Sequence, residues 1–268
     1  MTYAFIGLGN MAGAILSGMV RSGNFADDAL IGYDADEQKT LFWQREAGLR
    51  PAADERSAAD MADVIVLAIK PQVLGSVLPR IAPVVDKTKL VLTIIAGKPL
   101  QVYADALGQD VPVVRVLPNL NARVGASATA VCANRATNPD QLAIATRLFE
   151  AVGSVVAINE SQAPVFLALA GAAPAFAFLF VDALAAAGIR GGLSRNMAQN
   201  AAVDMMLGSA MLLKQTGDHP LVLADQVCSP GGTTIEGMHV LKALGFEHAV
   251  HEAISAVIKK DRSFSDRQ

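Results

Sequence analysis

The chain has 268 residues, enough for one large domain or two ordinary ones. It is 52% hydrophobic and only 18% charged, so it can bury a substantial core. The net charge is −3, and no run of basic residues is longer than Lys259-Lys260. This argues against nucleic-acid binding, which needs a clustered basic surface.

The first half of the chain alternates short apolar runs with amphipathic stretches, as in a parallel sheet covered by helices. The runs are continuous Val, Ile and Leu, which is typical of strands buried on both faces. Asn138-Pro139-Asp140 predicts a helix that ends near Ala151, because Asn is a good cap and Pro suits the first helical position. The predicted strands are Tyr3–Ile6, Ala29–Tyr33, Val64–Ile69, Leu90–Ile95, Val111–Leu117, Ala126–Cys132 and Val155–Ile158.

After Asn159 the strand signals end and apolar helical stretches follow. We therefore predict an α/β protein, with a mostly parallel Rossmann-type sheet over residues 1–159 and an all-helical dimerisation domain over residues 160–268. Helices this apolar are expected to be buried against a second copy. The predicted helices are Gln162–Ala187, Ser194–Lys214, Pro220–Val227, Thr234–Leu244 and Glu247–Asp261.

The stretch Ala163–Val181 has no charged or amide side chain and is long enough to span a bilayer. Prolines interrupt it and no aromatic or basic flanks bracket it, so a buried helix is favoured. The two cysteines, Cys132 and Cys228, show no metal or redox spacing. We expect both thiols to be reduced, as in a cytoplasmic enzyme. A disulfide between them is the alternative. No secretory leader is visible.

The first strand is followed by the motif Gly7-x-Gly9-x-x-Ala12, which opens a helical pattern. Gly7 allows a tight turn, Gly9 lets the backbone approach a pyrophosphate, and the small Ala12 keeps helix and strand close. An ordinary strand-to-helix turn is the alternative. The motif predicts a dinucleotide site.

The second strand ends at Tyr33-Asp34. An acid at this position normally holds the adenosine ribose hydroxyls and favours NADH over NADPH. Asp34 could instead only cap the next helix. The nearest cations that could meet a 2′-phosphate are Lys39 and Arg56.

Three further turns are expected at the same carboxyl edge of the sheet, where α/β proteins bind ligands. Lys70-Pro71 follows one strand, and Lys70 is a candidate cofactor contact and catalytic residue, or else a solvated edge lysine. Ala96-Gly97 follows the next strand. Asn119 could bind a nicotinamide carboxamide, or simply make a turn.

The stretch Cys228–Glu236 offers a second anion site of a different kind. Pro230, Gly231 and Gly232 force an irregular turn, and Thr233 with Glu236 predicts a capping box. The unpaired N–H groups at such a helix start suit a small carboxylate. The two anion sites together predict one cofactor and one small acid substrate.

The chain resembles pyrroline-5-carboxylate reductase, and the resemblance covers essentially its whole length. The motif Ser229–Ile235 is specific to that family, and the others occur more widely among dehydrogenases of this Rossmann type. The motifs that carry the resemblance are Phe5–Met11, Ala68–Pro71, Arg115–Asn119, Gly171–Phe176 and Ser229–Ile235.

The resemblance implies hydride transfer from a nicotinamide to the imine carbon of 1-pyrroline-5-carboxylate, which gives L-proline, in an intertwined homodimer or an assembly of dimers. It implies NADPH, with NADH as the alternative. Gly232, Thr233 and Thr234 would bind the substrate carboxylate, and the Thr234 hydroxyl would contact the ring nitrogen as the candidate catalytic group. Glu160 matches a family acid near the substrate, and Gln226 stands where the family commonly has Asn. The implied cofactor residues are Ile6, Gly7, Leu8, Gly9, Asn10, Met11, Asp34, Ala68, Ile69, Lys70, Pro71, Ala96, Gly97 and Asn119.

Two other functions fit the architecture. A β-hydroxyacid-type dehydrogenase needs a lysine or histidine base from the helical domain, and the stretch between Glu160 and Met211 contains neither. A scaffold that binds NAD(P)H without turnover is disfavoured by the loop around Gly232. His248 and His251 share a helix face but lack a third ligand, so no metal site is expected.

Overall fold

The computed structural model describes residues 1–265. The chain forms two compact units, which are described separately. Unit 1 contains Met1–Gly171 together with the carboxyl-terminal segment from Ile258, and unit 2 contains Ala172–Val257. The predicted boundary at 159/160 lies earlier in the chain than this division. The difference arises because residues after Asn159 still pack on the sheet, where Ala163 is buried against Leu117 and Ala130.

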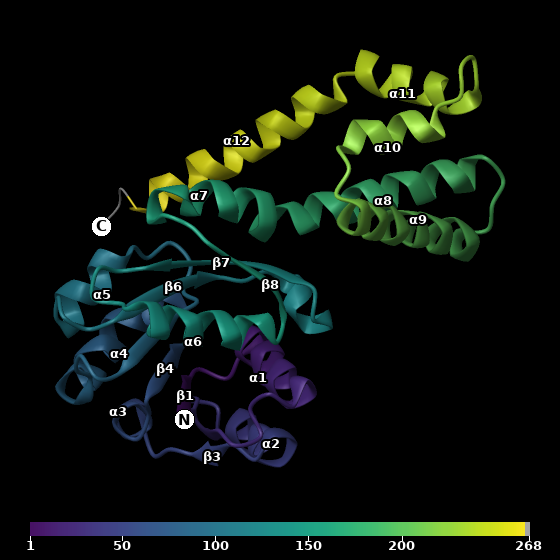
Figure 1. Ribbon diagram of the computed structural model, residues 1–268. Coiled ribbons are helices and arrows are strands. Elements are labelled where there is room, and N and C mark those ends of the chain that lie inside the picture. Colours follow the sequence, from purple (N-terminus) through teal and green to yellow (C-terminus); the bar gives the residue numbers. More distant parts are fainter. Residues whose placement is uncertain (266–268) are drawn as a thin grey trace. The chain divides into compact units, whose positions relative to one another are not determined.

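Unit 1 is built on an eight-stranded sheet in the order β3-β2-β1-β4-β5-β6-β7-β8 (Figure 1). Every neighbouring pair is parallel except β6 and β7, which are antiparallel. This confirms the predicted Rossmann-type, mostly parallel sheet. The strands are β1 Thr2–Ile6, β2 Ala29–Tyr33, β3 Arg50–Pro51, β4 Val64–Leu67, β5 Leu90–Thr93, β6 Val113–Leu117, β7 Ser127–Ala133 and β8 Gly153–Ala157. Only the two-residue β3 was not predicted.

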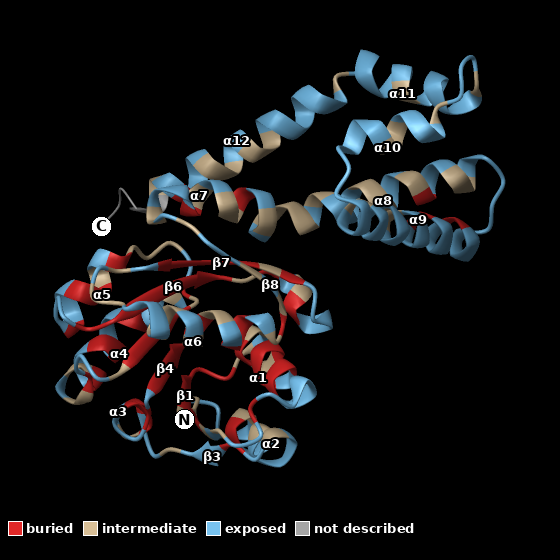
Figure 2. Cartoon of the chain, viewed as in Figure 1, coloured by how far each residue is buried: buried red, intermediate tan, exposed pale blue. Residues whose placement is uncertain are grey.

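Helices cover both faces of the sheet, and the central strands are buried, as Figure 2 shows in red. One core cluster lies on the face of α1, α2 and α6, and a second lies on the face of α3, α4 and α5. Burial on both faces explains why the strands have continuous apolar sequences. The helices are α1 Asn10–Ser22, α2 Glu37–Ala47, α3 Glu55–Asp60, α4 Leu74–Ile81, α5 Leu100–Leu107 and α6 Pro139–Glu150.

The start of α6 is the one predicted from the sequence. The Asn138 side chain accepts a hydrogen bond from the Gln141 N–H, and the Gln141 side chain accepts one from the Asn138 N–H. Pro139 occupies the first turn, where its missing N–H costs nothing. Short 3₁₀ segments complete the loops of unit 1: η1 Pro71–Val73, η2 Ala82–Val84, η3 Leu120–Val124 and η4 Glu160–Gln162.

The single helix predicted over Gln162–Ala187 is interrupted. The chain forms α7 Ala163–Phe166, a π-helical segment η5 Leu167–Ala172 and then α8 Ala173–Arg190. Pro164 and Pro174 lie in the first turns of α7 and α8, and proline has no N–H to continue a regular hydrogen-bond ladder. By length and composition alone, Glu160–Arg190 is apolar enough to cross a membrane.

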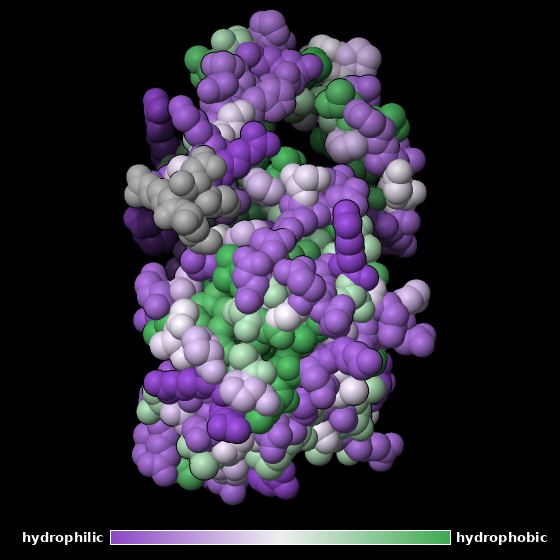
Figure 3. All heavy atoms as spheres, turned by 90° about the vertical axis from the view of Figure 1, so that its left-hand side faces the viewer, coloured by the Kyte–Doolittle hydropathy of each residue, from purple (hydrophilic) through white to green (hydrophobic). Residues whose placement is uncertain are grey.

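Unit 2 consists of helices: α8, α9 Arg195–Thr216, α10 Pro220–Val227, α11 Thr233–Ala243 and most of α12 Phe246–Ser265. Helices α8 and α9 pack closely, since a Cβ on Gly188 would lie 3.1 Å from that of Ala198. Many apolar side chains of this unit are nevertheless exposed, including Leu179 at 69% and Met211 at 61%. Figure 3 shows such apolar side chains, in green, at the surface among polar ones.

Candidate functional site

The turn between β1 and α1 has the geometry of a phosphate-binding turn. Gly7 adopts φ +93° and donates its N–H to the Tyr33 carbonyl at 2.8 Å. A Cβ on Gly7 would lie 2.6 Å from the Ala68 carbonyl oxygen, so any larger residue would clash with backbone. Helix α1 begins at Asn10 with Gly9 as its N-cap, and no side chain caps it. Its first N–H groups are therefore available to an anion.

A cleft of about 360 Å³ runs from this turn along the carboxyl ends of β2 and β4. A Cβ on Gly9 would meet no atom within 4 Å, so the space beside the turn is open. The cleft brings together residues that the sequence placed at separate strand ends. Its walls include Ile6, Gly7, Gly9, Asp34, Lys39, Glu55, Ala68, Ile69, Lys70 and Ser76. These features fit the pyrophosphate and adenosine part of a nicotinamide dinucleotide.

Asp34 is fixed at one end of this cleft by three donors. Its Oδ2 accepts the Leu8 N–H at 2.7 Å, and its Oδ1 accepts the Asp36 N–H at 2.9 Å and lies 3.2 Å from Lys39 Nζ. Burial alone would raise the pKa of Asp34, but these hydrogen bonds and the lysine outweigh it and lower the pKa below its ordinary value. The cap of α2 is a different acid, Asp36, which accepts the Gln38 N–H. The alternative interpretation of Asp34 as the cap of this helix is thus wrong.

Lys70 follows β4 and precedes the 3₁₀ turn that Pro71 begins. Its side chain is exposed, lines the cleft, and has no ion-pair partner among the described residues. Such a lysine can approach the phosphates of a bound dinucleotide. Its catalytic role remains a prediction.

Asn119, after β6, is 5% exposed, and both ends of its side-chain amide have partners. Its Oδ1 accepts the Asn121 N–H at 3.1 Å, and its Nδ2 donates to the Ala170 carbonyl at 2.9 Å. These contacts correspond to the turn-forming role. A contact between this amide and a nicotinamide stays a prediction, because it requires one of these bonds to open.

Glu160 is held by two groups of unit 1. Its Oε1 accepts the Leu100 N–H at 2.7 Å and lies 3.3 Å from Arg115 Nη1. The carboxylate thereby caps α5 and pairs with an arginine whose side chain is only 8% exposed. The β5–α5 turn, with Ala96 and Gly97 at φ +70°, is therefore tied to the end of β8. The charge of Arg115 inside an apolar strand is the one feature of the sequence that indicates a buried acidic partner.

The loop before α11 has the second anion-binding geometry. Gly231 has φ +67°, and Gly232 is the N-cap and has no side chain to satisfy the first N–H groups of the helix. The predicted capping box of Thr233 and Glu236 is wrong, because Thr233 is already the first helical residue. Its N–H and that of Thr234 consequently point out of the helix end without intrahelical acceptors. Gln226 is exposed near the end of α10.

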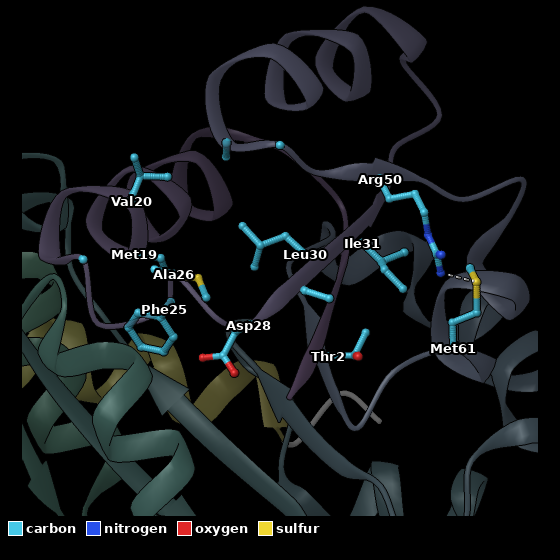
Figure 4. Close-up of a pocket in the computed structure, with 14 residues that line it drawn as sticks. Thr2, Met19, Val20, Phe25, Ala26, Asp28, Leu30, Ile31, Arg50 and Met61 are labelled. Atoms are coloured by element: carbon cyan, nitrogen blue, oxygen red, sulfur yellow. Dashed lines mark hydrogen bonds between the residues drawn. The ribbon is translucent and has the colours of Figure 1, made fainter.

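A larger hollow of about 550 Å³ lies at the opposite, amino-terminal edge of the sheet (Figure 4). Thr2 and Ala29, the first residues of their strands, line it. Arg50 there contacts the Met61 sulfur at 2.9 Å. None of the predicted site residues lies in it, so size alone does not identify the functional cleft.

Comparison with known proteins shows the family of the chain. A family model described as pyrroline-5-carboxylate reductase dimerisation matches residues 160–264, and one described as NADP oxidoreductase, coenzyme F420-dependent, matches residues 2–97. The pyrroline-5-carboxylate reductase of Escherichia coli K12 is 36% identical over 97% of both chains. This chain belongs to the pyrroline-5-carboxylate reductase family.

Solved structures of pyrroline-5-carboxylate reductases share the fold. The enzyme from Coxiella burnetii has a TM-score of 0.92 and 30% identity, and the alignment covers 98% of both chains. The Plasmodium falciparum enzyme, solved with NADP bound, has a TM-score of 0.87 and 27% identity over 99% of this chain and 98% of that one.

Among the described residues no group of three or more His, Cys, Asp or Glu could hold a metal ion.

Proposed function

We propose that this protein reduces 1-pyrroline-5-carboxylate to L-proline by hydride transfer from a reduced nicotinamide dinucleotide to the ring imine carbon. The observation that carries this proposal is the start of α11, where no side chain caps the helix and the Thr233 and Thr234 N–H groups have no intrahelical acceptor, inside the region that matches the family's dimerisation model. That geometry suits a small carboxylate. The reaction is the last step of proline biosynthesis.

The substrate carboxylate accepts hydrogen bonds from the backbone N–H groups of Thr233 and Thr234. The Gly232 N–H, which donates to the Ser229 carbonyl at 3.0 Å, joins them once that turn opens. The Thr234 hydroxyl lies one residue into the helix, where it can orient the ring nitrogen. An imine accepts hydride better when protonated, so a hydrogen-bonding group at nitrogen is useful and a strong acid–base pair is unnecessary. Most of the rate enhancement then comes from positioning, on the order of several kcal/mol. Gln226 and Glu160 are further polar contacts in this proposal.

The reductant occupies the cleft beside Gly7 and Gly9. Helix α1 places its free N–H groups against the pyrophosphate, and Lys70, which lines the same cleft, supplies a positive charge. When bound, the nicotinamide supplies the hydride. The resemblance implies NADPH, with NADH as the alternative, and the side chains that meet the adenosine 2′ position decide between them. Ala96, Gly97 and Asn119 follow neighbouring strands and serve the nicotinamide end.

The active form is a homodimer or an assembly of dimers in the cytoplasm. The exposed apolar surfaces of α8 and α9 support this, because monomeric soluble proteins rarely expose so much contiguous apolar surface. The match of residues 160–264 to a dimerisation domain supports it independently.

Oxidation of NADH and of NADPH, followed separately by absorbance with pyrroline-5-carboxylate, tests the activity. Oxidation of neither above background would refute it. Thr234→Ala should lower turnover far more than dinucleotide affinity, whereas Thr234→Ser, which keeps the hydroxyl, should retain most turnover. Equal losses of turnover and dinucleotide affinity in Thr234→Ala would assign Thr234 a structural role only.

A further inference from the structure

The adenosine end of the cleft is dominated by negative charge. Asp34 lies directly after β2, at the position that meets the adenosine ribose in dinucleotide-binding folds. Its side chain is 13% exposed, so it faces the cleft rather than bulk water. Glu55 lines the same cleft, with its side chain 12% exposed.

The carboxylate of Asp34 cannot easily turn away from a ligand. Its Oδ2 is bonded to the Leu8 N–H, inside the glycine turn itself, and its Oδ1 is bonded to the Asp36 N–H and Lys39. An ionised carboxylate offers about four acceptor positions, and these three donors leave about one free. That remaining position can accept a ribose hydroxyl. It can only repel a phosphate, which at neutral pH is an acceptor with a charge of about −1.5 to −2.

The cations that could meet a 2′-phosphate are either engaged or outside the cleft. Arg56 does not line it and instead lines a separate hollow with Asp54. Lys39 lies 3.2 Å from Asp34 and 3.8 Å from Asp36, so two carboxylates share its single charge. Arg80 is paired with Glu55 at 3.3 Å. Lys70 also lines the cleft, but it follows β4, whereas Asp34 follows β2. A 2′-phosphate would therefore have to compete with Asp34 and Asp36 for Lys39.

We infer that this protein uses NADH in preference to NADPH and that Asp34 sets this preference. The effect of this preference on turnover rests on the proposed function. The preference itself is a difference between two binding affinities and can be measured without turnover. The ribose hydroxyls of NADH donate to the free acceptor of Asp34, and the 2′-phosphate of NADPH meets a fixed carboxylate.

Binding of NAD⁺ and NADP⁺ to the full-length protein, measured by titration calorimetry, tests the inference without turnover. The fluorescence of Trp43, the only tryptophan of the chain, gives a second readout, since its ring lies 2.9 Å from where a Cβ on Gly13 of α1 would be. NAD⁺ should bind at least ~10-fold tighter than NADP⁺, which is about 1.4 kcal/mol. The value of kcat/KM should likewise be higher with NADH than with NADPH.

Asp34→Asn keeps the shape of the side chain and removes its charge, and Asp34→Ser also removes its bulk. Both should lose most of the discrimination, mainly through tighter NADP⁺ binding. The matched control is Asp86→Asn, an acid that also accepts a backbone N–H two residues ahead but lies before β5, at the other edge of the sheet. In Asp86→Asn, the ratio of the NADP⁺ to the NAD⁺ dissociation constant should equal that of the wild type.

Wild-type protein that binds NADP⁺ as tightly as NAD⁺, or tighter, would overturn the inference even if the Asp34 variants do not fold. A wild-type preference for NAD⁺ that Asp34→Asn leaves unchanged would show that another group sets it. Binding of neither dinucleotide would be a failure of the proposed function instead.

Discussion

The contact of Glu160 with Leu100 and Arg115 makes a measurable prediction about stability. Glu160→Ala leaves the Leu100 N–H without its acceptor and the Arg115 guanidinium, 8% exposed, without its acid. The Nε of Arg115 already lacks a hydrogen-bond partner among the described residues, and Glu160 is the only ion-pair partner of the guanidinium among them. Breaking a buried pair from one side costs about 3–5 kcal/mol. Because the Glu160 side chain is 34% exposed, we expect the lower end, about 3 kcal/mol of unfolding free energy.

A double variant of Glu160 and Arg115 tests whether the stability lost in each single variant comes from their ion pair or from separate contacts. Arg115→Met alone should cost less, about 1–2 kcal/mol, because the Glu160 carboxylate keeps the Leu100 N–H and some solvent. Glu160→Ala combined with Arg115→Met should be more stable than Glu160→Ala alone, since no unpaired guanidinium remains buried. Glu160→Gln should lie between wild type and Glu160→Ala, because it keeps an acceptor.

Urea unfolding followed by circular dichroism measures these free energies. All variants must be compared at one protein concentration, because subunit association contributes to stability. If the two single losses simply add in the double variant, the paired-charge reasoning is wrong. If Glu160→Ala keeps wild-type stability and only raises KM for pyrroline-5-carboxylate, Glu160 is a substrate ligand and not a structural tie.

Three further predictions concern the substrate loop, acid stability and assembly. Gly232→Ala should raise KM for the substrate at least ~10-fold in steady-state assays, because its Cβ would lie 3.1 Å from the Ser229 carbonyl oxygen, a backbone atom, whereas Gly237→Ala in open space should not. The pKa of Asp34 is lowered in the folded protein, so its contribution to stability is present above the ordinary aspartate value of about 3.9 and is lost as the pH falls through the folded value. Acid unfolding of Asp34→Asn should accordingly show a weaker pH dependence below about pH 4. Sedimentation should give at least twice the chain mass of 27.9 kDa, and a monomer mass would contradict the dimer.

Features that depend on neighbouring residues were predictable from the sequence. The seven predicted strands occur with their ends within two residues of the predicted ones, and the turn at Gly7 and the start of α6 occur where the pattern placed them. Each is set by local chemistry: burial on both faces, the conformational freedom of glycine, or the fixed φ of proline. The two-residue strand β3 offered no such pattern, because Arg50-Pro51 contains no apolar run.

Features that depend on distant residues were not predictable. The partners of Glu160 are 45 and 60 positions away along the chain, and nothing local to Glu160 indicates them. The Asn119 amide is engaged by Ala170, which no sequence spacing relates to it. The capping box at Thr233 failed for a different reason. Gly232 takes the extended N-cap conformation itself, so the helix begins one residue earlier than the pattern suggested.

The helices of unit 2 bury too little of themselves to be stable without a partner. Among the described residues, α8 buries only Ala185 and α9 only Ala198 and Ala202, while α10 and α11 bury none. Burying a methyl group yields only about 1 kcal/mol, and ordering one residue's backbone costs about as much. The large apolar side chains that could supply the difference, such as Phe178 and Met211, are exposed in the single chain. A second copy over these helices would therefore complete the core of unit 2 and hold α11, which follows the proposed substrate loop, in its folded form.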